Sequence, residues 1–152
     1  MENNIFEIYR IYVELTDKMS SRRSIINSFY LTINTGLFAT LAFVFKNSNL
    51  QTNYLILCSI VLICLGILIC LIWFINILSF KQINRVKFNV IKEIEKKLAF
   101  APYTMEWEII KKDKNKYFRQ TFIERTVPAV FIILHIIILT LILLNYENLY
   151  LP

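Results

Sequence analysis

The chain has 152 residues, of which 57% are hydrophobic and 18% are charged, with a formal net charge of +6. Soluble domains average about 45–50% apolar and about 25% charged residues, so this chain is more apolar than they are. Two Gly and three Pro are too few turn formers for an all-β fold of many short strands. The composition also excludes collagen, disordered chains and disulfide-rich scaffolds.

Three long stretches contain no Asp, Glu, Lys or Arg. A helix needs roughly 20 apolar residues to cross a hydrocarbon core about 30 Å thick. We therefore predict an all-α polytopic membrane protein with transmembrane helices at 25–45, 55–78 and 128–145. Pro128 suits the first turn of the third helix, where its missing N–H breaks no hydrogen bond.

The basic residues predict the orientation in the membrane. Sixteen of the 17 Lys and Arg residues precede the first span or lie between the second and third, and only Lys46 does not. Because basic residues are retained in the cytoplasm, we place the N-terminus inside and the C-terminus outside a bacterial inner membrane. Segments 1–24 and 79–127 are then cytoplasmic, whereas the loop 46–54 and the tail 146–152 are external.

The cytoplasmic segments that flank the first two spans have helical periodicity. Apolar residues recur in steps of three and four, which predicts amphipathic helices that extend these spans. No Pro or Gly separates 1–24 from the first span, so one continuous helix is expected, with any break at Ser20 and Ser21. The two stripes are Ile5, Ile8, Tyr12, Leu15 and Met19, and Ile83, Val86, Val90, Ile94 and Leu98.

Pro102 is expected to end the helix that follows the second span, because Pro disfavours a helical residue before it. A short helix over 105–112 comes next, and Asp113 is positioned to cap a last cytoplasmic helix over 114–125. Together these helices predict a helical layer at the cytoplasmic face of the membrane.

The first span differs from the other two by a face of small and polar side chains, which allows helices to approach closely. Three interpretations stay open: packing against the other spans, packing against copies of the same chain, or lining an aqueous path. The second and third spans are rich in Ile and Leu all round, which favours lipid contact. The candidates that face the oligomer or a pore are Ser24, Asn27, Ser28, Thr32, Asn34, Thr35 and Gly36.

Few side chains offer reactive chemistry. Cys58, Cys64 and Cys70 are six residues apart, so successive ones rotate by about 240° and share no face; we interpret them as small apolar residues facing lipid. His135 is ionisable at membrane depth, and is either a neutral imidazole bonded to a neighbouring helix or a proton-linked group. Without an HExxH motif, a Gly-rich phosphate loop or paired intramembrane carboxylates, we predict no catalytic residue, metal or cofactor, and no enzyme.

The positive charge of the cytoplasmic segment is explained by topology, so we predict no nucleic-acid partner. The basic run at 111–116 is expected to meet anionic lipid headgroups, at about 1 kcal/mol per basic residue near the surface. Membrane lipids and other copies of the chain are the partners that we predict, and protein partners stay unknown.

Three sequence blocks, taken in order, resemble one family. They are YVELTDKMSSRRSIINSFYLTIN, INRVKFNVIKEIEKKLAFAPYTMEWE and YFRQTFIERTVPAVF. Their order and spacing are similar to those of the RipA-like octameric membrane proteins, a family of small bacterial inner-membrane proteins. The matching cytoplasmic positions are Asn84, Lys87, Glu93, Glu95, Pro102 and Trp107.

The resemblance implies a homo-octamer and no enzymatic activity. The double arginine, Arg22 and Arg23, belongs to the matching blocks and is expected near the inner leaflet. Glu14, Asp17 or Glu124 could pair with these arginines there. Such pairs fix geometry more reliably than they add stability. A structural pairing and a ligand or partner site are both open interpretations of these residues.

Two functions follow as hypotheses. The first is a non-catalytic membrane assembly that scaffolds or regulates other proteins through its cytoplasmic layer. The alternative is a pore, as in a stress- or phage-defence effector, lined by the first span with Asn27, Asn34 and Thr35.

Overall fold

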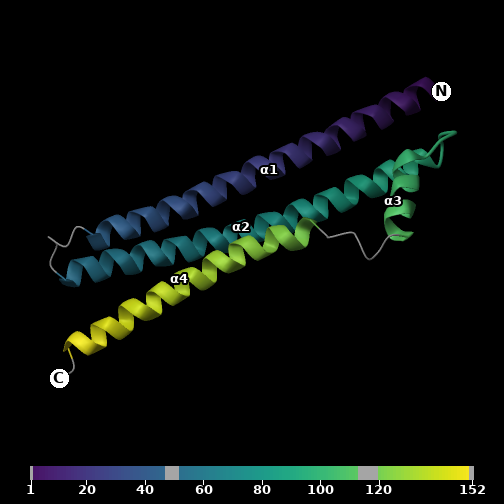
Figure 1. The fold of residues 1–152 in the computed structure, drawn as a ribbon. Helices are drawn as coiled ribbons and strands as arrows, with labels where there is room; N and C mark the ends of the chain where they lie inside the picture. Colours follow the sequence, from purple (N-terminus) through teal and green to yellow (C-terminus); the bar gives the residue numbers. More distant parts are fainter. Residues whose placement is uncertain (1, 47–51, 113–119, 151–152) are drawn as a thin grey trace. The chain divides into compact units, whose positions relative to one another are not determined.

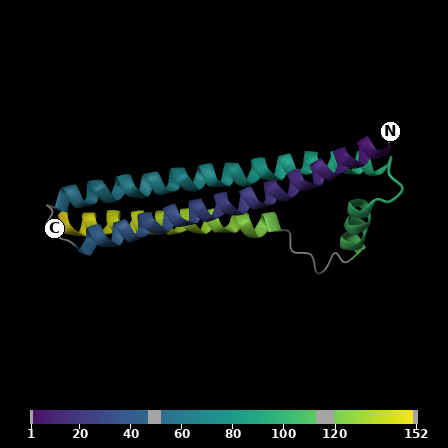
Figure 2. The same ribbon diagram turned by 90° about the horizontal axis from the view of Figure 1, so that it is seen from above.

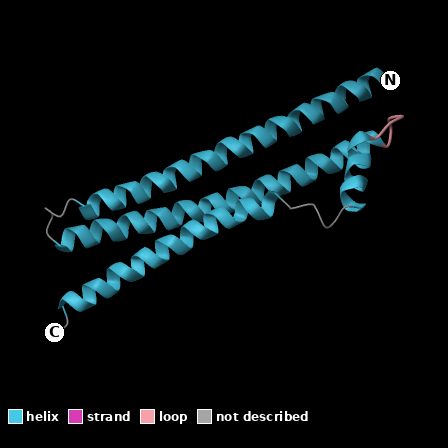
Figure 3. Ribbon diagram, in the orientation of Figure 1, coloured by secondary structure: helices cyan, strands magenta, loops and turns pink. Residues whose placement is uncertain are grey.

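The computed structural model describes residues 2–46, 52–112 and 120–150. These residues form four helices and no strand (Figures 1 and 3), which confirms the predicted all-α class. Helices α1, α2 and α4 are each long and apolar enough to cross a membrane, as the sequence predicted. The helices are α1 (Glu2–Lys46), α2 (Thr52–Glu95), α3 (Pro102–Lys112) and α4 (Gln120–Tyr150).

Helices α1 and α2 are too long to lie wholly within a membrane. They contain 45 and 44 residues, and at 1.5 Å per residue each is about 66–68 Å long, more than twice the thickness of a hydrocarbon core of about 30 Å. Their charged halves therefore extend outside it, because charged side chains are costly at membrane depth. The break considered at Ser20 and Ser21 is not formed, and α1 continues through both residues.

The helices after the second span begin and end differently from the prediction. Helix α2 ends at Glu95, and a turn follows in which the Leu98 amide donates to the Glu95 carbonyl at 3.0 Å. Helix α3 begins at Pro102 rather than at 105, because proline is well suited to the first position of a helix. The predicted cap, Asp113, and the first part of the helix over 114–125 lie outside the described residues.

The chain divides into two compact units. The charged unit contains Met1–Ile25 and Asn76–Ile123, and the apolar unit contains Ile26–Ile75 and Glu124–Pro152. Within the apolar unit, segments of α1, α2 and α4 lie side by side (Figures 1 and 2). Within the charged unit, the first half of α1 packs against the second half of α2, and α3 follows.

The second span has one packed face, which corrects the prediction that it is uniform. Its buried residues recur in steps of three and four along α2, so one side contacts protein while the other sides are exposed. Leu41 of α1 and Ile142 of α4 complete a core around Ile63. The buried face of α2 in the apolar unit consists of Ser59, Ile63, Gly66, Cys70 and Trp73.

Candidate functional site

Glu95 joins the three helices of the charged unit. This last residue of α2 is 2% exposed, and its carboxylate accepts hydrogen bonds from three residues. The Tyr9 hydroxyl of α1 donates at 3.1 Å, the Tyr103 amide at 2.8 Å, the Thr104 amide at 3.0 Å and the Thr104 hydroxyl at 2.7 Å. Glu95 thus caps the amino end of α3 with a negative charge, where the helix dipole favours it.

These hydrogen bonds set the ionisation of both partners. Burial raises the pKa of the Glu95 carboxyl, but the bonds from Thr104, from the two amides and from Tyr9 outweigh burial and hold that pKa below its usual value. Burial and the bond to Glu95 raise the pKa of Tyr9 to about 12. Glu95 therefore stays an anion and Tyr9 a donor, and together they join α1, α2 and α3.

Two further family-motif residues lie around α3. Pro102 is the first residue of the helix. The Trp107 ring has two ammonium groups near it, with Lys92 Nζ at 5.3 Å and Lys111 Nζ at 5.9 Å from its centroid. Such cation–π contacts attract exposed cations weakly. Each of the three motif residues therefore acts on α3: Glu95 caps it, Pro102 begins it, and Trp107 attracts Lys92 of α2.

The other motif residues are not part of the Glu95 network. Glu93 is exposed and pairs at 2.6 Å with Lys96, in the turn that follows α2. Lys87 Nζ donates to the Leu15 carbonyl of α1 at 3.2 Å, which ties the two helices of the charged unit. Asn84 is half-buried, and within the described part of the chain its Oδ1 atom has no hydrogen-bond donor.

The ion-pair candidates are dispersed along α1 and α4. Glu14 pairs with Arg10 one turn earlier at 3.3 Å, with both side chains exposed. Asp17 and Arg22 are exposed, whereas Arg23 and Glu124 are half-buried. Pairing of the two arginines with Glu14, Asp17 or Glu124 stays a prediction.

In the apolar unit, two polar residues of the first span are used within the chain. The Trp73 indole N–H donates to Asn27 Oδ1 at 2.9 Å. Asn34 is completely buried; its Nδ2 donates to the Tyr30 carbonyl at 2.9 Å, and its Oδ1 accepts from the Cys70 thiol at 3.1 Å. Asn34 therefore faces the interior of its own chain, which corrects its assignment to an oligomer or pore surface.

The thiol contact also corrects the interpretation of the cysteines. Cys58 and Cys64 are exposed, as expected for side chains in contact with lipid, but Cys70 is buried. The residue that contacts Cys70, Asn34, is 36 residues away in sequence, so a local pattern cannot distinguish Cys70 from the other two cysteines. The three cysteines are unpaired.

The remaining small residues of the first span form an exposed face. The hydroxyls of Thr32 and Thr35 donate to the carbonyls of Ser28 and Leu31 in the preceding turn, each at 2.9 Å, which satisfies them without another helix. A Cβ atom added at Gly36 would meet no described atom within 4 Å. This small-residue face, free for contact with another copy, contains Ser24, Ser28, Thr32, Thr35 and Gly36.

His135 of α4 is completely buried and packs directly on Gly66 of α2. A Cβ atom built on Gly66 would lie 2.0 Å from His135 Nε2, so only glycine leaves room for the ring. Phe38 covers the ring, with centroids 4.5 Å apart. His135 Nδ1 lies 2.7 Å from the Phe131 carbonyl, so the imidazole donates to its own helix and not to the neighbouring helix that one of the two interpretations expected.

Sequence reasoning missed Tyr9, Thr104 and Gly66. A signal existed for Gly66, because it is one of only two glycines in the chain and the other lies on the small-residue face. No comparable signal marked Tyr9 or Thr104. Within the described ranges, no group of three or more His, Cys, Asp or Glu residues is placed to hold a metal ion.

Comparison with known proteins identifies a family. A sequence model described as the octameric membrane protein family (8xMP) matches residues 6–144. No curated protein and no solved structure matches the chain.

Proposed function

Because the chain belongs to the octameric membrane protein family, we propose that it is a non-catalytic assembly that scaffolds or regulates other proteins through its charged unit. The observation that carries this proposal is the Glu95 network. A segment that only connects two spans needs no buried carboxylate that caps one helix and bonds to another. Such a network holds exposed surfaces in fixed positions, as a binding platform requires.

The orientation is part of the proposal. With the charged unit in the cytoplasm of a bacterium and both external segments outside the inner membrane, the platform meets cytoplasmic partners and anionic lipid headgroups. A reporter that is active only in the cytoplasm, fused after Pro152, should be inactive. An active reporter would show that the C-terminus is in the cytoplasm and that the proposed orientation is wrong.

The alternative function is a pore lined by the first span. Its support is the small-residue face, where exposed Thr32 and Thr35 could face a path between copies. The scaffold is favoured because Asn27 and Asn34, the most polar residues offered for a pore lining, bond to Trp73 and Cys70 inside the chain.

Flux measurements separate the two functions. The purified octamer in liposomes should conduct neither protons, potassium ions nor a small dye, at acidic or neutral pH and under voltage of either sign. The matched variant carries Thr32→Val and Thr35→Val, which keep the side-chain shapes and remove both hydroxyls. Flux in the natural chain that the variant lacks would overturn the scaffold and establish the pore.

A positive test of the scaffold uses photo-crosslinking in cells. A photoreactive residue at Glu108, which is exposed on α3, should give adducts with other proteins. The matched control places the same group at Leu68, which is 54% exposed in the apolar unit and should react with lipid. If Glu108 gives adducts only with copies of this chain, the scaffold role is wrong.

A further inference from the structure

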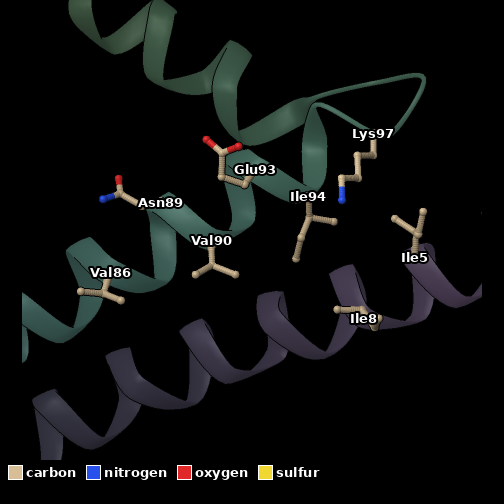
Figure 4. A pocket seen from close by; sticks show the side chains of 8 residues that line it. All are labelled: Ile5, Ile8, Val86, Asn89, Val90, Glu93, Ile94 and Lys97. Atoms are coloured by element: carbon tan, nitrogen blue, oxygen red, sulfur yellow. The ribbon is translucent and has the colours of Figure 1, made fainter.

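An open apolar groove lies in the charged unit between α1 and α2. It has a volume of about 460 Å³, and its sides are formed by Ile5 and Ile8 of α1 and by Val90 and Ile94 of α2. Figure 4 shows the side chains of Val86, Val90 and Ile94 directed toward α1, with the Lys97 side chain at one end. Ile8 is 47% exposed and Ile5, Val90 and Ile94 are half-buried, so the apolar sides of this groove are partly open.

Helix α3 of the same unit has the opposite feature, an apolar face without a cover. None of its residues is buried, and Met105 and Ile109, one turn apart on one face, are 48% and 65% exposed. An isolated helix of 11 residues is marginal in water, because nucleation is costly and few turns follow it. The Glu95 cap and the Trp107 contacts fix one side of α3 and leave the Met105 side free.

The location of both surfaces indicates what covers them. Exposed apolar residues within a membrane contact lipid and gain nothing from association by the hydrophobic effect. The groove and α3 belong to the charged unit, where apolar surface in contact with water favours association. Since the chain belongs to a family of octamers, a second copy is available to every protomer at this level.

A closed ring needs two different surfaces on each protomer, one for each neighbour. We propose that the groove receives α3 of a neighbouring copy, with Met105 and Ile109 packing against Val90 and Ile94. The groove is lined by one acid and one base, Glu93 and Lys97. Glu93 is already paired with Lys96 at 2.6 Å, so Lys97 at the end of the groove is the charge that complements Glu106, which is next to Met105 on α3. This interface does not depend on the scaffold role.

Disulfide trapping between two distinguishable copies tests the interface. In a background of Cys58→Ala, Cys64→Ala and Cys70→Ser, one tagged chain carries Val90→Cys and a differently tagged chain carries Ile109→Cys. Each chain has a single thiol, so a bond between the two tags joins different copies. The two tags should become linked on mild oxidation of the octamer, because disulfides form only between closely placed Cβ atoms.

The matched control moves the second thiol by one position, to Glu108→Cys, which turns it about 100° around α3. Loss of the linkage there would support the assigned face, and equal linkage at both positions would overturn it. Absence of linkage with Ile109→Cys would also overturn the proposal. If Ile109→Cys is instead shielded from a soluble maleimide only when liposomes are added, the occupant is lipid and the proposal fails.

Charge reversal provides an independent test. Lys97→Glu should shift the mass of the detergent-solubilised complex from the octamer to smaller species, because it places two acids across the interface. Adding Glu106→Lys in the same chain should restore the octamer, since each protomer then presents the reversed pair to its neighbours. If the complex of the double variant has no greater mass than that of Lys97→Glu alone, the pairing is refuted. An unchanged complex mass in Lys97→Glu would refute it as well.

Discussion

Replacing Gly66 with Ala tests whether the contact with His135 holds the apolar unit together. The new Cβ would lie 2.0 Å from Nε2, 2.6 Å from Cδ2 and 2.8 Å from Cε1 of the ring. The ring cannot turn away without losing the bond from Nδ1 to Phe131. Overpacking of a core costs about 1–3 kcal/mol, and three simultaneous overlaps place this site at the upper end, about 3 kcal/mol.

The helix propensity of Ala offsets part of that cost, because Ala is favoured over Gly by about 1 kcal/mol in a helix interior. Gly66→Ala should therefore lower the free energy of unfolding by about 2 kcal/mol. The matched control is Gly36→Ala, which meets no described atom and should raise it by about 1 kcal/mol. The difference between the variants, about 3 kcal/mol, isolates the overlap with the ring.

Equilibrium unfolding in mixed detergent micelles, followed by helix content, measures both variants. The mass of the complex should be recorded alongside, because Gly36 lies on the small-residue face and its substitution can weaken the octamer without altering the fold of one chain. A double-mutant cycle with His135→Ala completes the test, and Gly66→Ala should cost much less once the ring is absent. Equal effects of the two glycine substitutions, or a cost at Gly66 that persists without the ring, would refute the reasoning.

Three further predictions concern other contacts. Glu95→Gln should destabilise the charged unit by about 2 kcal/mol, because it weakens charge-assisted hydrogen bonds. Folding lowers the pKa of Glu95. The stabilisation from its ionised form should therefore be complete above the usual carboxyl pKa and be lost as the pH falls through the lowered pKa. Denaturant unfolding at a series of pH values checks this direction. Trp73→Phe should lower the free energy of unfolding by about 1 kcal/mol, because it removes the hydrogen-bond donor to Asn27. If the loss of that bond is the cause, adding Asn27→Ala to Trp73→Phe should lower the free energy of unfolding little further. Replacing Lys111 and Lys112 with Gln should weaken binding to anionic vesicles by about 2 kcal/mol and leave binding to neutral vesicles unchanged; sedimentation with vesicles measures both.

Local sequence patterns predict the helices because helix formation depends on residues that are close together in the sequence. An unbroken apolar stretch needs lipid or a core, and a stripe in steps of three and four needs a partner helix. No Pro or Gly separates 1–24 from the first span, and Gly36 is the one glycine within 1–46, so the continuity of α1 also follows from the sequence. The sequence does not predict the start of α3 at Pro102, because the capping residue, Glu95, lies several residues before the helix rather than next to it.

The residues of the candidate site depend instead on partners that are distant in sequence. Glu93 and Glu95 occur in the same KEIEKK run, and only the position of Tyr9 on α1 and the turn before α3 decide that Glu95 is buried. Likewise, Cys64 and Cys70 are equivalent by composition, but only Cys70 meets Asn34. Local periodicity contains no information about which helix lies opposite, so such residues need a structure.

The two units achieve specificity by different physical means. In the apolar unit, lipid is as apolar as the side chains, so a few directional or close contacts must select the packing. Asn27 with Trp73, Asn34 with Cys70 and Gly66 with His135 are contacts of that kind.

In the charged unit, water makes apolar burial favourable, and the buried Glu95 carboxylate is costly unless its hydrogen bonds form. Substitutions at these interior contacts of the apolar unit should therefore alter how one chain folds in the membrane. Those in the groove and on the free face of α3 should alter how chains associate while each chain stays folded. Measuring unfolding and complex mass on the same variants tests that separation, and a groove variant that unfolds the chain without first dissociating the octamer would contradict it.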